Sequence, residues 1–270
     1  MKRRTVLSTL LALTLAATLT ACTGTPEAPE ISPTPTPEPV PTVTPTQEPT
    51  PTPAPEPPVW SEQVIQRTFT AGDGTQVMQV SYTLPLIQNT DACPAGAAIN
   101  DWYKSEGSRR LAEAEENYEM VVADYDVSQA SGFPFTPTTE EMTSQVCYED
   151  EAVISICRNW YLSSSAPYPT TFRLSEQFDA QTGEQLGSVD FFTDPDTVQE
   201  RVVDAFLAQE VIRSGGFTRD QVTLAYQAEH FYLTDEGYVF WIQGNTLTGL
   251  HEPVEVTLTY NALKDVSSHG

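Results

Sequence analysis

The sequence has 270 residues, with 37 acidic and 13 basic side chains, so its formal charge is −24. This charge argues against a nucleic-acid-binding protein, because binding to phosphates requires a basic face. It also argues against direct adsorption to an anionic membrane, unless a separate group attaches the chain. The length fits one or two domains, and the 22 prolines are concentrated near the N-terminus.

Residues 1–21 have the pattern of a signal peptide. Three basic residues (2–4) precede an uncharged stretch (6–19) that is too short to span a bilayer. The next segment, LTAC at 19–22, resembles the lipobox of bacterial lipoproteins. That resemblance implies cleavage before Cys22 and a diacylglyceryl group on its sulfur, and two acyl chains suffice for stable anchoring. The alternative is an ordinary secretory signal followed by an unrelated cysteine.

Residues 22–58 are predicted to form a lipidated Pro/Thr-rich tether. Positions 23–58 hold 14 prolines and nine threonines and show no apolar periodicity, so they cannot form a core. Proline favours the polyproline II conformation, in which 36 residues would span roughly 110 Å. Such a spacer would hold a folded domain away from the membrane. A proline-rich ligand of an SH3-type domain is the alternative interpretation.

Residues 59–270 are predicted to be one extracytoplasmic domain, divisible into halves 59–165 and 166–270. Without the five acidic residues of the tether and the three basic residues of the signal peptide, 32 acidic and 10 basic residues are left, a charge of −22. Period-2 patterns and turn residues predict strands. The expected strands cover 64–70, 77–86, 144–148, 152–162, 170–178, 185–189, 230–234, 238–243 and 254–260.

Two helices are expected in this domain. The first covers 95–125, with Gly107 as a weak point, and the second begins at Pro195 with Asp194 as its N-cap and ends at the glycines 215–216. The apolar stripe of the first helix comprises Ile99, Trp102, Tyr103, Leu111, Ala114, Tyr118, Val121 and Val122. Because strands and helices are segregated, the sequence predicts an α+β fold with antiparallel sheets.

The order of these segments resembles the extracytoplasmic region of the anti-sigma-V factor (RsiV-like) family, which also accompanies some peptidoglycan deacetylases. The matching segments of the first half are YTLPL at 82–86, AAIN at 97–100 and AVISI at 152–156. Those of the second half are FDAQTGEQL at 178–186, DFF at 190–192, FYL at 231–233, VFW at 239–241 and the final strand at 254–263.

Two family segments are replaced in this sequence. Residues 163–168 stand where the family often has Gly-Gly-Ala-His, and residues 244–249 replace a Pro-Tyr segment. The resemblance implies a sensor-like, non-catalytic domain. The sensing member of the family binds lysozyme, a strongly basic protein, so the resemblance and the acidity together suggest a cationic extracellular partner such as lysozyme.

The sequence contains no motif for a catalytic triad, a zinc protease, a phosphate loop or a dinucleotide site, and we expect neither catalytic residues nor a cofactor. The densest acidic cluster is Asp190, Asp194, Asp196 and Glu200. Calcium binding by this cluster is left open, although the EF-hand spacing is absent and Asp194 is already expected to cap a helix.

The cysteines other than Cys22 are Cys93, Cys147 and Cys157. An oxidising compartment allows one disulfide and one free thiol among them, and the sequence does not select the pair. Cys147 and Cys157 flank a predicted turn at unequal distances, so they are not expected to be directly opposite each other.

The sequence therefore predicts a membrane-anchored lipoprotein of the bacterial cell envelope, with a ligand- or protein-binding domain on the extracytoplasmic side. Two alternatives are an enzyme that acts on cell-wall material through paired carboxylates and a structural assembly protein of the envelope.

The first prediction concerns attachment. Replacing Cys22 by alanine removes the only acceptor for lipid in the LTAC motif, so we expect the variant to leave the membrane fraction or to stay unprocessed. Fractionation and mass spectrometry of the N-terminus measure this. Normal processing and membrane retention of the variant would contradict it.

Overall fold

A computed structural model describes residues 55–164, 168–247 and 249–269. The predicted signal peptide, Cys22 and the predicted tether up to residue 54 lie outside the described residues. The described residues belong to one compact unit, 51–270. Within them, every helix is too short or too polar to span a bilayer.

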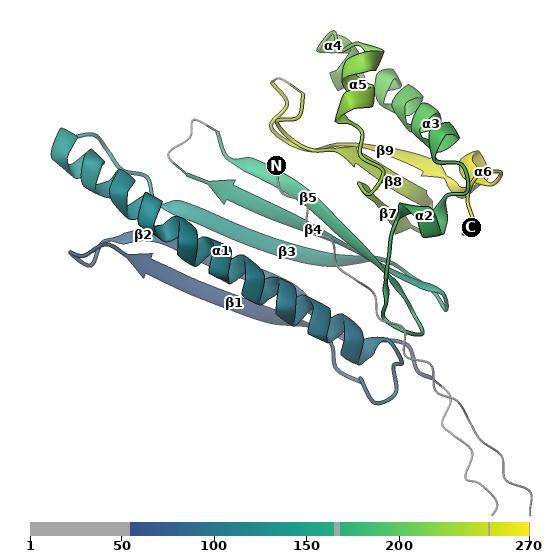
Figure 1. The fold of residues 1–270 in the computed structure, drawn as a ribbon, viewed down its shortest axis with the longest axis horizontal. Helices are drawn as coiled ribbons and strands as arrows, with labels where there is room; N and C mark the ends of the chain where they lie inside the picture. The colour runs from purple at the N-terminus through teal and green to yellow at the C-terminus, as the bar shows by residue number, and fades with distance from the viewer. Residues whose placement is uncertain (1–54, 165–167, 248, 270) are drawn as a thin grey trace, which may run out of the picture. The chain divides into compact units, whose positions relative to one another are not determined.

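A six-stranded sheet forms the first part of the domain (Figure 1). Its strands lie in chain order: β1 (Trp60–Thr70), β2 (Gln76–Ile87), β3 (Thr138–Glu149), β4 (Val153–Ser163), β5 (Thr170–Asp179) and β6 (Gln185–Leu186). Neighbours are antiparallel except β2 and β3, which run parallel because a long helix carries the chain back between them. The α+β class is confirmed, and this one parallel pair is a departure from the expected antiparallel sheets.

The long helix α1 (Gly96–Ser131) lies across this sheet, as Figure 1 shows. Ile99, Tyr103 and Ala114 of the predicted stripe are buried and its other members are half-buried, which confirms the predicted face. The helix extends six residues beyond the predicted end. Gly107 allows α1 to lie close to the sheet: a Cβ there would lie 2.5 Å from Ile65 Cδ1 and 2.8 Å from Leu84 Cδ1, so these two side-chain ends would have to shift.

A second, three-stranded antiparallel sheet and five short helices complete the domain (Figure 1). They are β7 (Phe231–Thr234), β8 (Gly237–Ile242), β9 (Val254–Thr259), α2 (Ser188–Phe191), α3 (Pro195–Ala208), α4 (Glu210–Ser214), α5 (Arg219–Ala225) and α6 (Tyr260–Leu263). Asp194 caps α3 as predicted by accepting from the Thr197 N–H. The predicted helix to Gly215 is two helices, because the backbone is extended at Gln209. The predicted strand 185–189 ends at Leu186, where the chain turns into α2.

Strand β7 packs its free edge against side chains of the larger sheet. The Leu233 N–H donates to Ser155 Oγ at 3.0 Å. The Phe231 carbonyl accepts from Gln177 Nε2 at 2.8 Å and from Ser175 Oγ at 2.6 Å. An edge strand exposes unpaired backbone groups, and these polar side chains satisfy them. The two sheets are therefore joined by specific hydrogen bonds as well as by apolar packing.

A buried ion network joins α1 to β4 and β5. Arg158 of β4 is 3% exposed and pairs with Glu176 of β5 and, at 3.2 Å, with Glu106 of α1. The Tyr103 hydroxyl donates to the same Glu176 carboxylate at 3.0 Å. Burial raises the pKa of Glu176, and the Arg158 guanidinium opposes that rise. Arg158 thus links two carboxylates that come from different elements: it is the counter-charge of Glu176, and it shares Glu106 with Arg109 and Arg110.

The second prediction tests this network by replacing Arg158 with methionine. Glu176 would lose its buried counter-charge, whereas Glu106 would keep Arg109 and Arg110, so we expect unfolding to become easier by about 3–5 kcal/mol. Chemical denaturation measures the change. Arg213→Met is the matched control, because Arg213 forms an exposed pair with Glu210 and its loss should have no measurable effect. Equal stability of the two variants would contradict the assignment.

Candidate functional site

The larger sheet divides between β2 and β3. The two strands pair only between Met78–Tyr82 and Thr138–Met142, although each continues for several residues beyond these ranges. The Gln88 N–H donates to the Val59 carbonyl. The backbone N–H and C=O groups of even-numbered residues in this part of β2 therefore point toward β1, and the backbone nitrogen of Pro85 points toward β3. Proline has no N–H to donate to a neighbouring strand. The parallel ladder therefore cannot continue past this position.

The end of the β2 edge is closed by α1. The Asn100 side chain donates to the Ile87 carbonyl and accepts from the Ile87 N–H, each at 2.8 Å. These two bonds replace those that a neighbouring strand would supply. The Ile-Asn pair at 99–100 thus contributes one core residue and one residue that closes the edge, and the division of the sheet is stably maintained.

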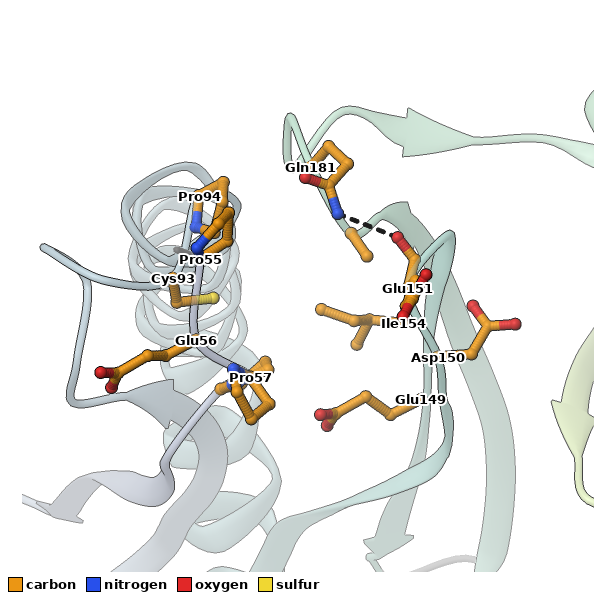
Figure 2. A pocket seen from close by; sticks show the side chains of 12 residues that line it. Pro55, Glu56, Pro57, Cys93, Pro94, Glu149, Asp150, Glu151, Ile154 and Gln181 are labelled. Carbon is orange, nitrogen blue, oxygen red and sulfur yellow. Dashed lines mark hydrogen bonds between the residues drawn. The ribbon is translucent and has the colours of Figure 1, made fainter. Parts of the chain in front are cut away.

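A cavity of about 530 Å³ lies at the open end of this division; we call it the cleft. Its lining residues are Pro55, Glu56, Pro57, Pro58, Cys93, Pro94, Glu149, Asp150, Glu151, Ile154, Ala180 and Gln181. In Figure 2 the Cys93 sulfur and the Ile154 side chain point toward each other from opposite walls. The cleft therefore has apolar walls beneath an acidic rim, and its lining includes no lysine or arginine.

Glu149 is the acidic side chain that reaches across the cleft. In Figure 2 it extends from the end of β3 toward Pro57, whereas Glu56 points away from the opposite wall. Its Oε2 accepts from Trp60 Nε1 at 2.7 Å. Asp150 is engaged in its own turn, where one carboxylate oxygen accepts from the Ala152 and Val153 N–H groups. The inward-facing charge of the cleft is thus concentrated at Glu149.

One wall of the cleft is the proline segment, residues 55–58, which the sequence predicts to be part of the tether. The Glu56 N–H donates to the Ala92 carbonyl at 2.9 Å, and Asn89 Nδ2 donates to the Pro57 carbonyl at 2.9 Å. Asn89 Oδ1 also accepts from the Val59 N–H at 2.7 Å. The loop between β2 and α1 therefore holds this segment in place as a wall.

A second cavity, of about 500 Å³, lies along the same division of the sheet. It is lined by Trp60, Ser61, Glu62, Pro85, Ser144, Gln145 and Val146. Ser144 Oγ donates to the Thr83 carbonyl at 3.0 Å and bridges the two strands beyond the end of their ladder. The Trp60–Glu149 hydrogen bond connects the lining of this cavity to that of the cleft.

The four acidic residues considered for calcium binding do not form one group of ligands, because they have different contacts. Asp190 accepts from the Gly187 N–H at 2.9 Å, and Asp194 caps α3. Asp196 and Glu200 line a different cavity, together with Arg219. Among the described residues, no three or more histidine, cysteine, aspartate or glutamate side chains are grouped so that they could hold a metal ion.

The structure resolves the cysteine pairing that the sequence left open. Cys147 and Cys157 form a disulfide, and Cys93 is free and buried in the cleft wall. The register of β3 and β4 shifts between Val146 and Tyr148, and this irregularity brings the two unequally spaced cysteines together. The disulfide packs near Trp241, at the junction of the two sheets.

The cleft itself was not predicted from the sequence. The sequence predicts strands at 144–148 and 152–162, so Glu149 and Asp150 fall in the turn between them, and no motif indicates that Trp60 belongs to a site. His269 Nε2 lies 3.5 Å from Oδ2 of the cleft residue Asp150. The other two histidines lie elsewhere: His230 stacks on Trp241 with ring centroids 5.0 Å apart, and burial lowers its pKa. His251 stacks on Tyr168 in an outer loop.

No family model matches the sequence, and no curated protein matches it either. Solved structures do match the fold. A member of the DUF3298 family from Bacteroides fragilis aligns with a TM-score of 0.55 at 13% identity, covering 78% of this chain and 94% of its own. A DUF3298 family protein from Pseudomonas aeruginosa aligns with a TM-score of 0.54 at 11% identity, covering 79% and 95%.

The chain shares the fold of DUF3298 proteins. At these identities the likeness concerns the fold alone. RsiV-like extracytoplasmic domains are related to DUF3298, so the segment order noted in the sequence and the structural likeness lead to the same group of folds.

The third prediction concerns the acid stability of the β3–β4 turn. Burial alone would raise the pKa of Asp150, but hydrogen bonds from the Val153 N–H, the Tyr148 hydroxyl and the Ala152 N–H lower it below 3.8. An acid with a lowered folded-state pKa stabilises the fold above its unfolded-state pKa, and this contribution is lost as the pH falls through the folded-state value. Asp150→Asn should therefore destabilise the domain at pH 7.

Denaturation of the wild type and of Asp150→Asn across pH 7 to about 2.5 measures this contribution. We expect the difference in stability between the two proteins to narrow as the pH falls below about 4. A difference that is constant over the whole range would show that the ionised carboxylate is not what stabilises the turn.

Proposed function

We propose that this protein is a lipid-anchored lipoprotein of the bacterial cell envelope whose domain binds a cationic extracytoplasmic protein, such as lysozyme, without catalysis. The observation that carries the proposal is the cleft: an acidic rim with no basic lining residue, on a domain with 32 acidic and 10 basic residues. Complementary charge accelerates association and selects partners. The signal and LTAC motif support the location, and the fold of DUF3298 proteins is compatible with a binding domain.

The placement of the buried charges supports a non-catalytic role. An acid–base pair in an enzyme must reach the substrate, whereas Glu106 and Glu176 are buried between α1 and the sheet and paired with Arg158. In the cleft, Asp150 is hydrogen-bonded within its own turn. Glu149 is left as an accessible carboxylate, which suits electrostatic recognition.

The fourth prediction is salt-dependent binding of a basic protein. We expect the full chain, purified in a neutral detergent, to bind lysozyme at low salt. Added salt shortens the Debye length from about 10 Å at 0.1 M to about 3 Å at 1 M. Because long-range charge mainly steers encounter, the association rate should fall more than the dissociation rate rises. Surface plasmon resonance at the two salt concentrations measures both rates.

An acidic protein of similar size is the control. Equal binding of both proteins, or no binding of lysozyme at low salt, would remove the cationic partner from the proposal. Turnover of peptidoglycan fragments by the purified chain would instead overturn the non-catalytic assignment.

A further inference from the structure

We propose that the cleft binds a lysine or arginine side chain from an extended segment of the cationic partner, with Glu149 as the acceptor of its charge. This inference deepens the proposed function and rests on it. It assigns the recognition to one cavity and one carboxylate, rather than to the acidity of the whole domain.

The chemistry of the walls matches such a side chain. Lysine and arginine bury their methylene stems against apolar surface and keep their charged heads beside a polar group. The cleft offers the rings of its prolines and the Cys93 side chain on one wall and Ile154 on the other. Glu149 extends across these walls toward Pro57, where the head of an inserted side chain would lie. A volume of about 530 Å³ is within the usual range of ligand sites.

Glu149 is held in a position from which it can accept a cation. Its Oε2 is fixed by the Trp60 indole N–H at 2.7 Å, and a carboxylate accepts further hydrogen bonds through its second oxygen. The indole is neutral, so the charge of Glu149 is oriented but not compensated by it. A charge-assisted hydrogen bond from an ammonium or guanidinium group would supply that compensation.

The division of the sheet gives the partner's backbone room to lie beside the inserted side chain. The cleft and the second cavity, of about 500 Å³, both follow the line along which β2 and β3 separate, and the Trp60–Glu149 bond connects their linings. The acidic lining residues of the two cavities include Glu62 as well as Glu149, and neither lining contains a basic residue. An extended, positively charged segment is the occupant that these features favour.

The test uses the full chain in a neutral detergent and a blocked pentapeptide of alanines with a central lysine. Binding is followed by calorimetry and by tryptophan emission, because Trp60 contacts the proposed acceptor. We expect the lysine peptide to bind and to change the emission. The same peptide with norleucine, which keeps the stem but lacks the charge, should bind at least about tenfold more weakly, and an arginine peptide should bind as the lysine peptide does.

Three variants make the assignment specific. Glu149→Gln keeps an acceptor for Trp60 but loses the charge, and should weaken binding at least about tenfold. Glu119→Gln changes the net charge equally at an exposed position on α1 and should leave the affinity unchanged. Trp60→Phe removes the indole N–H that orients Glu149 but keeps the charge, so it should lose the emission change and weaken binding by calorimetry less than Glu149→Gln does. Circular dichroism establishes that each variant is folded.

Several results would overturn the inference. These are equal affinities of wild type and Glu149→Gln, equal binding of the lysine and norleucine peptides, and no peptide binding at millimolar concentration. Titration with lysozyme separates this inference from the proposed function. If lysozyme binds the wild type and Glu149→Gln equally, only the role of the cleft fails; if lysozyme does not bind at all, the proposed function fails with it.

Discussion

The pairing of Arg158 with Glu106 and Glu176 is the interaction on which the arrangement of the domain depends. The larger sheet is continuous in hydrogen bonding only through the short parallel ladder between β2 and β3, so another element must hold its halves together. Helix α1 does so. Asn100 and Gly107 attach it to β2, and Glu106 and Tyr103 attach it to β4 and β5 through the buried charges. A buried charge that loses its partner is strongly destabilising, so this attachment specifies a single position for the helix.

The same division of the sheet produces the cleft. Pro85 ends the ladder because it has no N–H, and Asn100 then occupies the backbone groups of Ile87 that a strand would otherwise use. If β2 and β3 were paired along their whole length, no space would be left for the cleft. The cost of two unpaired strand ends is reduced by the Ser144 and Trp60 hydrogen bonds across the gap. The cleft therefore exists because Pro85 and Asn100 interrupt the pairing of β2 with β3.

Local features of the sequence could be predicted and long-range ones could not. The hairpin of β1 and β2, the Asp194 cap and the apolar stripe of α1 follow from turn chemistry, capping and periodicity. The first half of β3 was missed because Thr138–Thr143 is largely polar; Glu140 is buried there because the Tyr82 hydroxyl donates to it at 2.7 Å. No local pattern specifies the parallel pairing or the position of the strand irregularity that brings Cys147 to Cys157. The cleft depends on the first of these, because it lies where the parallel pairing of β2 and β3 has ended.

The proline segment, residues 55–58, connects the cleft to the part of the chain that precedes the domain. Residues 55–58 are continuous in sequence with the proline- and threonine-rich stretch, and they also form a wall of the cleft, held by Asn89 and Ala92. Proline has a fixed φ, so this wall needs few hydrogen bonds to be well defined. A side chain bound between the proline segment and Ile154 would add contacts to both and would stabilise the docked state of the segment. If the cleft binds a side chain as proposed, that binding and the placement of the proline segment would be coupled through the same four residues.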